Sequence, residues 1–264
     1  TAGESMVSLV VEAGAVFDAQ NKTMSVTGRL IVDGTYTSDM VAAKNLSFSG
    51  DTIGGSGTIA INDAASSLNI SSNVVFIPSA RLNLLGNINI GNGSTVTNQG
   101  QLIVSGSIDG ENATGSVWIN DFDAVLEIGD SLMYVGQLFA SASGNSITYN
   151  QQGPQPVKTP TASTYYNLII SGTGAKSIGD RLIIDNDLSI FSGTLDGSND
   201  SIEIHGDWLN QSVFQAGTGT VIFNGSSHQS VNNPSGELFY NLTIDKPGGN
   251  LILESSVIAR NILT

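Results

Sequence analysis

Hydrophobic residues recur at every second position in short runs along almost the whole chain. In each run a polar or small residue separates two large aliphatic or aromatic ones. The pairs in the first half of the sequence are Met24/Val26, Leu30/Val32, Leu46/Phe48, Ile59/Ile61, Leu68/Ile70, Leu82/Leu84, Ile88/Ile90 and Leu102/Val104. Because successive side chains of a β-strand point to opposite faces, this alternation predicts many short strands, each burying one face.

Glycine, asparagine and aspartate separate these runs and leave no room for crossover helices. Two folds fit short strands at this density. One is a parallel β-solenoid, in which each rung contributes two or three strands that stack on those of its neighbours; the other is an array of β-sandwiches. The short strands and the recurring pattern favour an all-β, elongated parallel β-solenoid (β-helix) with internal repeats, and the β-sandwich array is the second choice.

The pentapeptides YNLII at 166–170 and YNLTI at 240–244 lie 74 positions apart and belong to a longer internal repeat. Residues 146–190 align with 220–264 without a gap, and a long period of this kind is typical of repeat architectures. We therefore expect a solenoid region with short rungs over 1–123 and a first repeat copy over 124–197. A second copy over 198–264 is truncated, and we expect it to continue in a longer parent protein.

We expect both pentapeptides to be packing elements. Alternation predicts that their aliphatic residues point into the core, namely Leu168, Ile170, Leu242 and Ile244. Tyr166 and Tyr240 share this parity and would close the core with a ring. The side-chain amides of Asn167 and Asn241 would pair with the backbone of a turn.

Composition and charge exclude several classes of partner. Glycine accounts for 31 of the 264 residues and charged residues for 12%, which suits tight turns better than long helices. The net charge of −14, with no basic cluster, argues against binding to nucleic acid or to an anionic membrane. The chain lacks cysteine and has no apolar run of about 18 residues that could span a bilayer. It begins at Thr1 rather than methionine, and we expect a processed or excised piece.

A series of motifs marks the second half of the chain. IEIHGDW at 202–208 precedes an F-x-x-G-x-G-T-V segment that begins at Phe214, and GTVIFNG at 219–225 precedes the second YNLxI pentapeptide. Over roughly 124–264 this series resembles the β-rich repeats of very large secreted and cell-surface proteins of Bacteroidetes. Many of those proteins are adhesins exported by type IX secretion, and some are linked to gliding motility. The resemblance implies an extracellular location at the bacterial cell surface and a role in cell adhesion.

The same resemblance draws attention to three hydroxyl groups. In Bacteroidetes, O-glycans are attached at Asp-Ser/Thr-apolar triplets, and this chain has such triplets at 51–53, 130–132 and 200–202. The candidate glycosylation sites are therefore Thr52, Ser131 and Ser201.

Calcium is the one metal ion that the sequence suggests. It requires clustered oxygen ligands, and the segments DNDLS at 185–189 and DGSND at 196–200 supply them at turns. If these turns lie on adjacent rungs, a Ca²⁺ site would be formed by Asp185, Asp187, Asp196 and Asp200. The scattered acidic residues also account for solubility without any metal.

The two histidines are the natural candidates for catalysis. The repeat argues against that role, because Pro154 stands in place of His228 in the first copy, and Gly129 or Ser131 in place of His205. We expect both histidines at the surface or in turns. The chain also lacks the common hydrolase, metalloprotease and nucleotide-binding motifs, and we do not expect an enzyme.

The sequence thus predicts a structural and adhesive segment, a stalk or contact surface, of a large bacterial cell-surface protein. Its partners would be neighbouring repeats of the same chain and a surface polysaccharide or other cell-surface ligand. The alternative is a carbohydrate-active β-helix enzyme or a polysaccharide-binding module. Most of the aromatic residues that could stack on sugars are expected in the core or at rung edges: Trp118, Trp208, Tyr165, Tyr166 and Phe239.

Overall fold

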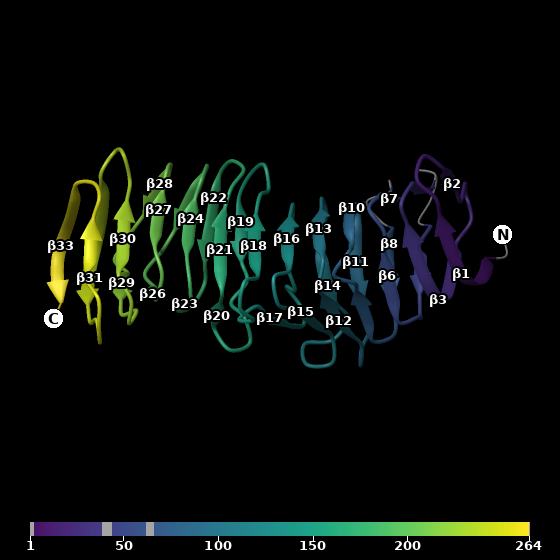
Figure 1. Cartoon of the computed structure of the whole chain (residues 1–264), viewed down its shortest axis with the longest axis horizontal. Coiled ribbons are helices and arrows are strands. Elements are labelled where there is room, and N and C mark those ends of the chain that lie inside the picture. The colour runs from purple at the N-terminus through teal and green to yellow at the C-terminus, as the bar shows by residue number, and fades with distance from the viewer. Residues whose placement is uncertain (1–2, 39–43, 62–65, 264) are drawn as a thin grey trace. The chain divides into compact units, whose positions relative to one another are not determined.

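A computed structural model describes residues 3–38, 44–61 and 66–263. Every regular element in these residues is a β-strand, and the described strand pairs are parallel (Figure 1). The chain divides into two compact units, Thr1–Leu138 (unit 1) and Phe139–Thr264 (unit 2). Each unit is a parallel β-solenoid, as predicted. The second choice, a β-sandwich array, is wrong, because the sheets of β-sandwiches are antiparallel.

Three rows of stacked strands build most of unit 1. The first row contains β5 (Leu46–Phe48), β8 (Ser67–Ile70), β11 (Asn87–Ile90) and β14 (Ile108–Gly110). The second contains β6 (Thr52–Gly54), β9 (Val74–Phe76), β12 (Thr95–Asn98) and β15 (Val117–Asn120), with β17 (Gln137–Phe139) after it. The third contains β2 (Val16–Asp18), β4 (Thr35–Ser38), β7 (Thr58–Ile61), β10 (Arg81–Leu85), β13 (Gln101–Val104) and β16 (Val125–Ile128).

The first rungs of unit 1 differ from the later ones. The long strand β3 (Met24–Val32) pairs with β5 through its first half and with β6 through its second half. β1 (Glu4–Val11) pairs with β3 along its other edge. One continuous strand therefore spans two rows here, and a corner separates those rows in the rungs that follow.

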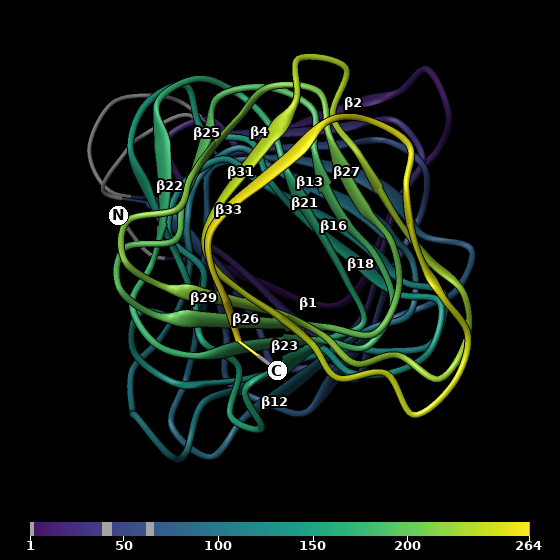
Figure 2. The ribbon, with the colours of Figure 1, turned by 90° about the vertical axis from the view of Figure 1, so that its left-hand side faces the viewer.

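Unit 2 has three sheets, which form three sides of its coil (Figure 2). The β20 sheet contains β20 (Thr164–Tyr165), β23 (Leu182–Ile184), β26 (Ser201–Ile204), β29 (Thr220–Phe223), β31 (Glu237–Ile244) and β33 (Val257–Leu263). The β18 sheet of this unit contains β18 (Ser146–Tyr149), β21 (Asn167–Ile170), β24 (Leu188–Ile190), β27 (Trp208–Asn210), β30 (Gln229–Asn232) and β32 (Leu251–Leu253). The β19 sheet contains only β19 (Gln155–Val157), β22 (Ala175–Ile178), β25 (Thr194–Asp196) and β28 (Val213–Gln215).

The core of each unit consists of inward-facing side chains stacked from rung to rung. All sixteen residues of the alternating pairs in the first half of the sequence are buried, which confirms the predicted alternation. In unit 2, Trp208 lies edge-on to Phe214 and Phe239, with ring centroids 4.8 and 5.3 Å away. Aromatic contacts of this geometry add to the free energy gained from burial. No helix in the described residues has the length and apolar character needed to cross a membrane.

The YNLxI pentapeptides follow the prediction only in part. Leu168, Ile170 and Leu242 are buried, but Ile244 is 46% exposed, because it lies beyond the last described partners of β31 and β33. The predicted inward position of the tyrosines, Tyr166 and Tyr240, is wrong.

The buried rings belong instead to the preceding residues, Tyr165 and Phe239. In both copies the tyrosine and the asparagine after it are both half-buried, so the alternation of buried and exposed positions shifts by one residue there. The predicted role of the asparagines is confirmed: Asn167 Nδ2 donates to Asn145 O (2.9 Å), and Asn241 Nδ2 donates to Thr218 O (3.0 Å).

The two sequence copies occupy different sheets. YNLII lies mainly in β21 of the β18 sheet, whereas YNLTI lies in β31 of the β20 sheet. Likewise, β19 of the first copy and β30, which begins 74 positions later in the second copy, belong to different sheets. The offset of 74 residues is therefore not a whole number of turns of the coil. The expected segments 1–123, 124–197 and 198–264 remain a prediction about the sequence repeat.

The copies nevertheless share one local turn. In the first copy, Lys176 Nζ donates to the carbonyls of Gln151 and Gly153, both at 2.9 Å, and also to Thr173 O. In the second copy, Lys246 Nζ donates to Gly225 and Ser227, which stand 74 positions after Gln151 and Gly153. Burial lowers the pKa of both lysines. The repeated turn thus binds an ammonium group that comes from a different part of the sequence each time.

Asparagine and aspartate side chains connect successive rungs at the turns. In unit 1, Asn73 Oδ1 accepts from Thr95 N (2.9 Å), and Asp33 Oδ1 accepts from Ser56 N (3.0 Å). In unit 2, Asp187 Oδ1 accepts from Asp207 N (2.8 Å), and Asp207 Oδ1 accepts from Ser230 N (2.6 Å). We call this arrangement the Asx ladder. It satisfies backbone donors at the corners, where the pairing between strands is interrupted.

Candidate functional site

Two rows of polar residues meet at the corner between the β20 sheet and the β18 sheet of unit 2. Asp185, His205 and Asn224 directly follow β23, β26 and β29, which are strands of three successive rungs. Asp187 and Asp207 directly precede β24 and β27 on the other side of the corner. Because the rungs stack in register, each row is built from equivalent positions.

These rows line an open groove of about 600 Å³, which we call the polar groove. Its other lining residues are Asn186, Gly206, Gly225, Ser226, Ser227, His228 and Pro247. Three carboxylates and two imidazoles therefore line it. No lysine or arginine occurs among its described lining residues, so the groove is acidic overall.

Two glycines allow the corner to stack this tightly. A Cβ atom on Gly206 would lie 2.2 Å from the carbonyl oxygen of Asn186, and one on Gly225 would lie 2.0 Å from that of His205. Such contacts are far closer than a side-chain carbon tolerates, and only glycine permits them. The close approach brings successive rungs, and the polar side chains they carry, into one groove.

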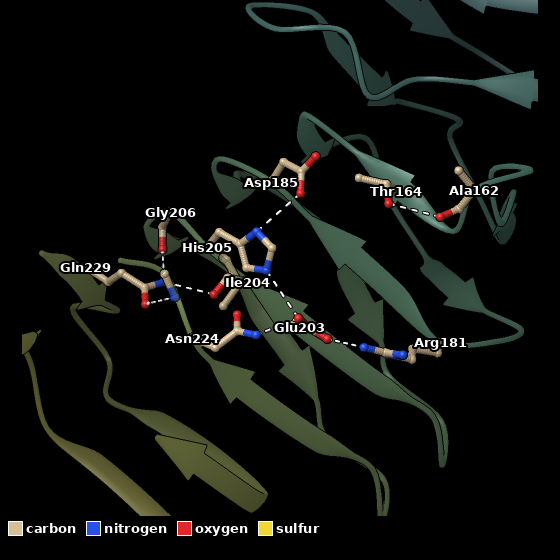
Figure 3. Close-up of polar contacts among 11 residues, drawn as sticks. Ala162, Thr164, Arg181, Asp185, Glu203, Ile204, His205, Gly206, Asn224 and Gln229 are labelled. Carbon is tan, nitrogen blue, oxygen red and sulfur yellow. Dashed lines mark hydrogen bonds and ion pairs between the residues drawn. The ribbon is translucent and has the colours of Figure 1, made fainter. Parts of the chain in front are cut away.

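His205 lies between two carboxylates (Figure 3). Its Nδ1 is 3.2 Å from Asp185 Oδ1, and its Nε2 is 3.2 Å from Glu203 Oε1. Carboxylates only accept hydrogen bonds, so both contacts are hydrogen bonds when both ring nitrogens carry protons. With both nitrogens engaged, the imidazole holds the two acidic residues in place.

Glu203 anchors the outer end of this arrangement. It forms an ion pair with Arg181, and Asn224 Nδ2 donates to its Oε1 (2.5 Å). Burial alone would raise the pKa of the Glu203 carboxyl. The hydrogen bonds from Asn224, Arg181 and His205 outweigh burial and leave this pKa below its ordinary value.

The loop at the other end of the groove is also fixed by hydrogen bonds. The buried Gln229 donates through Nε2 to Ile204 O (2.9 Å) and Gly206 O (2.6 Å), and it accepts from Gly225 N (2.9 Å) (Figure 3). His228 Nδ1 accepts from Asn250 N (3.1 Å). The groove therefore has a preorganised wall, and in each of its ladder carboxylates, Asp187 and Asp207, only Oδ1 accepts a hydrogen bond from the described residues.

The four predicted calcium ligands do not form one cluster. Asp185 and Asp187 line the polar groove, whereas Asp196 and Asp200 belong to β25 and the turn after it. Asp196 Oδ1 accepts from Ser198 N (2.9 Å) within that turn. Among the described residues, no three histidine, aspartate or glutamate side chains are grouped so that they could hold a metal ion.

The three predicted glycosylation sites are all half-buried. Thr52 begins β6, and its hydroxyl donates to Asp51 Oδ1 (2.8 Å). Ser131 precedes the buried Leu132, and Ser201 begins β26. The proposal that they carry glycans stays a prediction.

Sequence reasoning placed His205 and His228 at the surface or in turns, where they are found, but missed the groove that they line with Asp207 and Asn224. The signal that would have found it is the rung spacing. Asp185 and His205 are 20 positions apart, and so are Asp187 and Asp207. The longer period of 74 residues hides this spacing.

Comparisons of this chain with protein-family models, with curated proteins and with solved structures gave no match.

Proposed function

We propose that this chain is a structural and adhesive segment of a secreted bacterial cell-surface protein, and that the polar groove contacts a surface glycan. The observation that carries the proposal is the groove itself. Two of its three carboxylates, Asp187 and Asp207, are held in fixed positions by backbone donors of the next rung, so they are preorganised to accept hydrogen bonds. The solenoid supplies the rigid support, and the groove supplies the contact.

The chemistry of the groove favours a particular class of glycan. Carboxylate and amide oxygens accept hydrogen bonds from sugar hydroxyls, and carboxylates also attract the ammonium group of an amino sugar. Uronic acids would face three carboxylates without a lysine or arginine among the described lining residues to compensate. We therefore expect neutral or amino-sugar polysaccharides to bind, and uronate polysaccharides to bind only if Ca²⁺ bridges the two sets of carboxylates.

A carbohydrate-active enzyme is the second candidate. The arrangement that favours it is the carboxylate–imidazole–carboxylate series of Asp185, His205 and Glu203 beside an open groove. Glycoside hydrolysis requires an acidic pair at a defined separation, on either side of the bond to be cleaved. The two candidates differ in one respect that can be measured, which is the release of shorter products.

The test is retention of the chain on immobilised neutral, amino-sugar and uronate polysaccharides, with and without Ca²⁺, while soluble products are assayed in parallel. The double variant Asp187→Asn/Asp207→Asn keeps the amide oxygens needed by the Asx ladder and removes two charges from the groove. Asp33→Asn is the control for substitution of a ladder residue outside the groove, because Asp33 belongs to the ladder of unit 1.

Retention that the double variant loses and the control keeps would support the adhesive groove. Product release would replace this proposal with the enzyme. Equal retention by the variant and the control, or retention by none, would reject the groove as the contact.

A further inference from the structure

The β19 sheet of unit 2 stops at β28, while the other two sheets continue through β30 to β33 (Figure 1). β28 pairs with β25 on one side and is the end strand of its sheet. Rungs with three strands are thus followed by rungs with two. The change leaves a step on the surface of unit 2, at the place where a fifth strand of this sheet would lie.

The step contains a groove of about 370 Å³, which we call the step groove. One wall is the β28 segment from Val213 to Gly217. The other wall consists of Leu238 and Tyr240 from β31 and Arg260 from β33. Val213 is 50% exposed and Leu238 42% exposed. Two large apolar side chains therefore remain accessible beside an open strand edge.

The backbone of β28 is oriented for a further parallel strand. Gly197 N donates to Gln215 O (2.9 Å), so this carbonyl faces the β25 side. Successive residues of a parallel strand direct their peptide groups to opposite neighbours. The peptide groups of Phe214 therefore face the step groove.

The register of the existing strands specifies what a further strand would carry. Lys176, Leu195 and Phe214 are successive partners in the β19 sheet. The side chain at this position is therefore charged in β22 and apolar in β25 and β28, the two strands nearest the step. Phe214 also packs against Trp208 and Phe239. An added strand would place its central side chain next to this aromatic cluster, where an aliphatic residue fits best.

Arg260 supplies the charge at the opposite wall. Its guanidinium lies 5.8 Å from the centroid of the Tyr240 ring, and the side chain is exposed. No carboxylate of the described chain forms an ion pair with it. In a chain with net charge −14, this is an isolated cationic position, and it complements an acidic residue of a ligand.

We infer that the step groove binds a short extended peptide segment, which adds to β28 as a parallel strand. The segment has an aliphatic central residue, followed by an acidic residue that pairs with Arg260. A peptide fits better than a glycan, because only a peptide can continue the hydrogen-bonding pattern of a strand edge. This inference is independent of the polar groove and of the proposed glycan contact.

The sequence of β25 provides a probe with the required chemistry. Residues 191–198 read FSGTLDGS, in which Leu195 is the central residue and Asp196 the acidic one. The experiment titrates a capped synthetic peptide of this sequence into the ¹⁵N-labelled chain and follows amide chemical shifts. We expect saturable shifts confined to 213–217, 238–240 and 260. Peptide concentrations up to the millimolar range are needed, because such short strands bind weakly.

Two variants test the chemistry. Arg260→Glu should weaken binding of this peptide by roughly tenfold, and a peptide with Asp196→Lys should recover binding to that variant. Arg29→Glu in unit 1 is the control with the same change of charge, and it should leave binding unchanged. A peptide with Leu195→Asn should not bind.

The inference would be overturned if the peptide caused no amide chemical-shift changes at β28 of the folded chain. It would also be overturned if the peptide with Leu195→Asn caused the same changes. Equal effects of Arg260→Glu and Arg29→Glu would reject the acidic residue as part of the recognition.

Discussion

The two tryptophans are both fully buried, but their indole N–H groups differ. Trp208 Nε1 donates to Glu237 Oε2 (2.7 Å), a buried carboxylate that also accepts from Asn210 Nδ2 (2.8 Å). Trp118 Nε1 is buried and has no hydrogen-bond partner among the described residues. A buried donor without a partner lowers the stability of the folded state, whereas a hydrogen bond donated to a buried carboxylate stabilises the folded state.

This contrast leads to a prediction for two matched variants. Trp118→Phe and Trp208→Phe remove the same atoms from two cores, but only the second deprives a buried carboxylate of a donor. We expect Trp208→Phe to lower the free energy of unfolding by at least about 1 kcal/mol more than Trp118→Phe. Urea unfolding monitored by circular dichroism measures the difference. Equal losses would mean that the Glu237 hydrogen bond contributes nothing net.

A closed series of hydrogen bonds holds two buried tyrosines in unit 2. Lys158 N donates to the Tyr149 hydroxyl (3.0 Å), and the Tyr149 and Tyr165 hydroxyls are 2.8 Å apart. The Tyr165 hydroxyl donates to Lys158 O. In this order each hydroxyl donates once and accepts once. Burial raises the pKa of both tyrosines above the ordinary 10.0, and the charge of the neighbouring Tyr149 hydroxyl and the hydrogen bond with it raise the pKa of Tyr165 further.

These shifts predict a loss of stability at alkaline pH. A tyrosine whose pKa is raised in the folded state stabilises it fully below pH 10.0, and this contribution is lost progressively above that value. Tyr165→Phe should lower the free energy of unfolding at neutral pH by about 1–3 kcal/mol and make the alkaline decline shallower. Denaturant unfolding between pH 8 and 12, in steps of about one unit, measures both effects.

The neighbouring variant Tyr166→Phe is the control, since that side chain is half-buried and takes no part in the series. We expect a change within about 0.5 kcal/mol and an unaltered alkaline decline. If Tyr166→Phe also made the alkaline loss of unfolding free energy shallower, the effect would not be specific to the buried Tyr149–Tyr165 pair.

At this scale the sequence predicted which side chains are buried in most strands. It failed at Tyr166, which lies at the corner between β20 and β21, and at Tyr240, where the alternation shifts by one residue inside β31. Nothing in YNLII distinguishes a tyrosine that precedes a corner from one inside a strand. The pairing of His205 with Asp185 and Glu203 was likewise hidden, since it depends on how the rungs stack.

At the scale of the elements, the Asx ladder explains why asparagine and aspartate separate the strands so regularly. Their side chains do more than tolerate turn conformations, because each also accepts a hydrogen bond from the backbone of the following rung. The ladder therefore sets the register between rungs at the corners. Within the strands the register follows from the buried columns.

Asp187 allows the structural and the binding contributions of the ladder to be separated. Asp187→Asn keeps an oxygen that accepts from Asp207 N, and we expect the free energy of unfolding to change by less than about 0.5 kcal/mol. Asp187→Ala removes the acceptor and should cost about 1–2 kcal/mol. Thermal and urea unfolding of the two variants test this prediction. A loss with Asp187→Asn as large as that with Asp187→Ala would show that charge, rather than the hydrogen bond, matters there.

The strands themselves could be predicted from the sequence, and so could their stacking in parallel. Their distribution among sheets could not, because it depends on where the chain bends. β31 runs as one strand through Tyr240, whereas the chain leaves β20 at Tyr166 and enters β21 in another sheet. The two stretches have nearly the same sequence, so the difference arises from the neighbouring rungs.

At the scale of the whole molecule, each compact unit contains one tryptophan, Trp118 in unit 1 and Trp208 in unit 2. Repeat structures are stabilised mainly by contacts between neighbouring rungs, so a local change acts first on the rungs around it. The single-tryptophan variants thus report on each unit separately.

We expect Tyr165→Phe to shift the unfolding midpoint of the Trp208 fluorescence in the Trp118→Phe background. In the Trp208→Phe background, the same substitution should shift the Trp118 signal clearly less. Each double variant is compared with the single-tryptophan variant from which it was made, in the same urea titration. Equal shifts of the two signals would show that the units unfold as one cooperative body.

Because the two repeat copies lie in different sheets, a binding partner would approach each copy from a different direction. Tyr166 and Tyr240 introduce nearly identical pentapeptides that lie on different sides of the coil of unit 2. An antibody or other reagent raised against one pentapeptide would thus meet its second copy from another direction and beside other neighbours. Duplication of a segment in such a coil multiplies the directions in which a motif is displayed, rather than extending one uniform stripe.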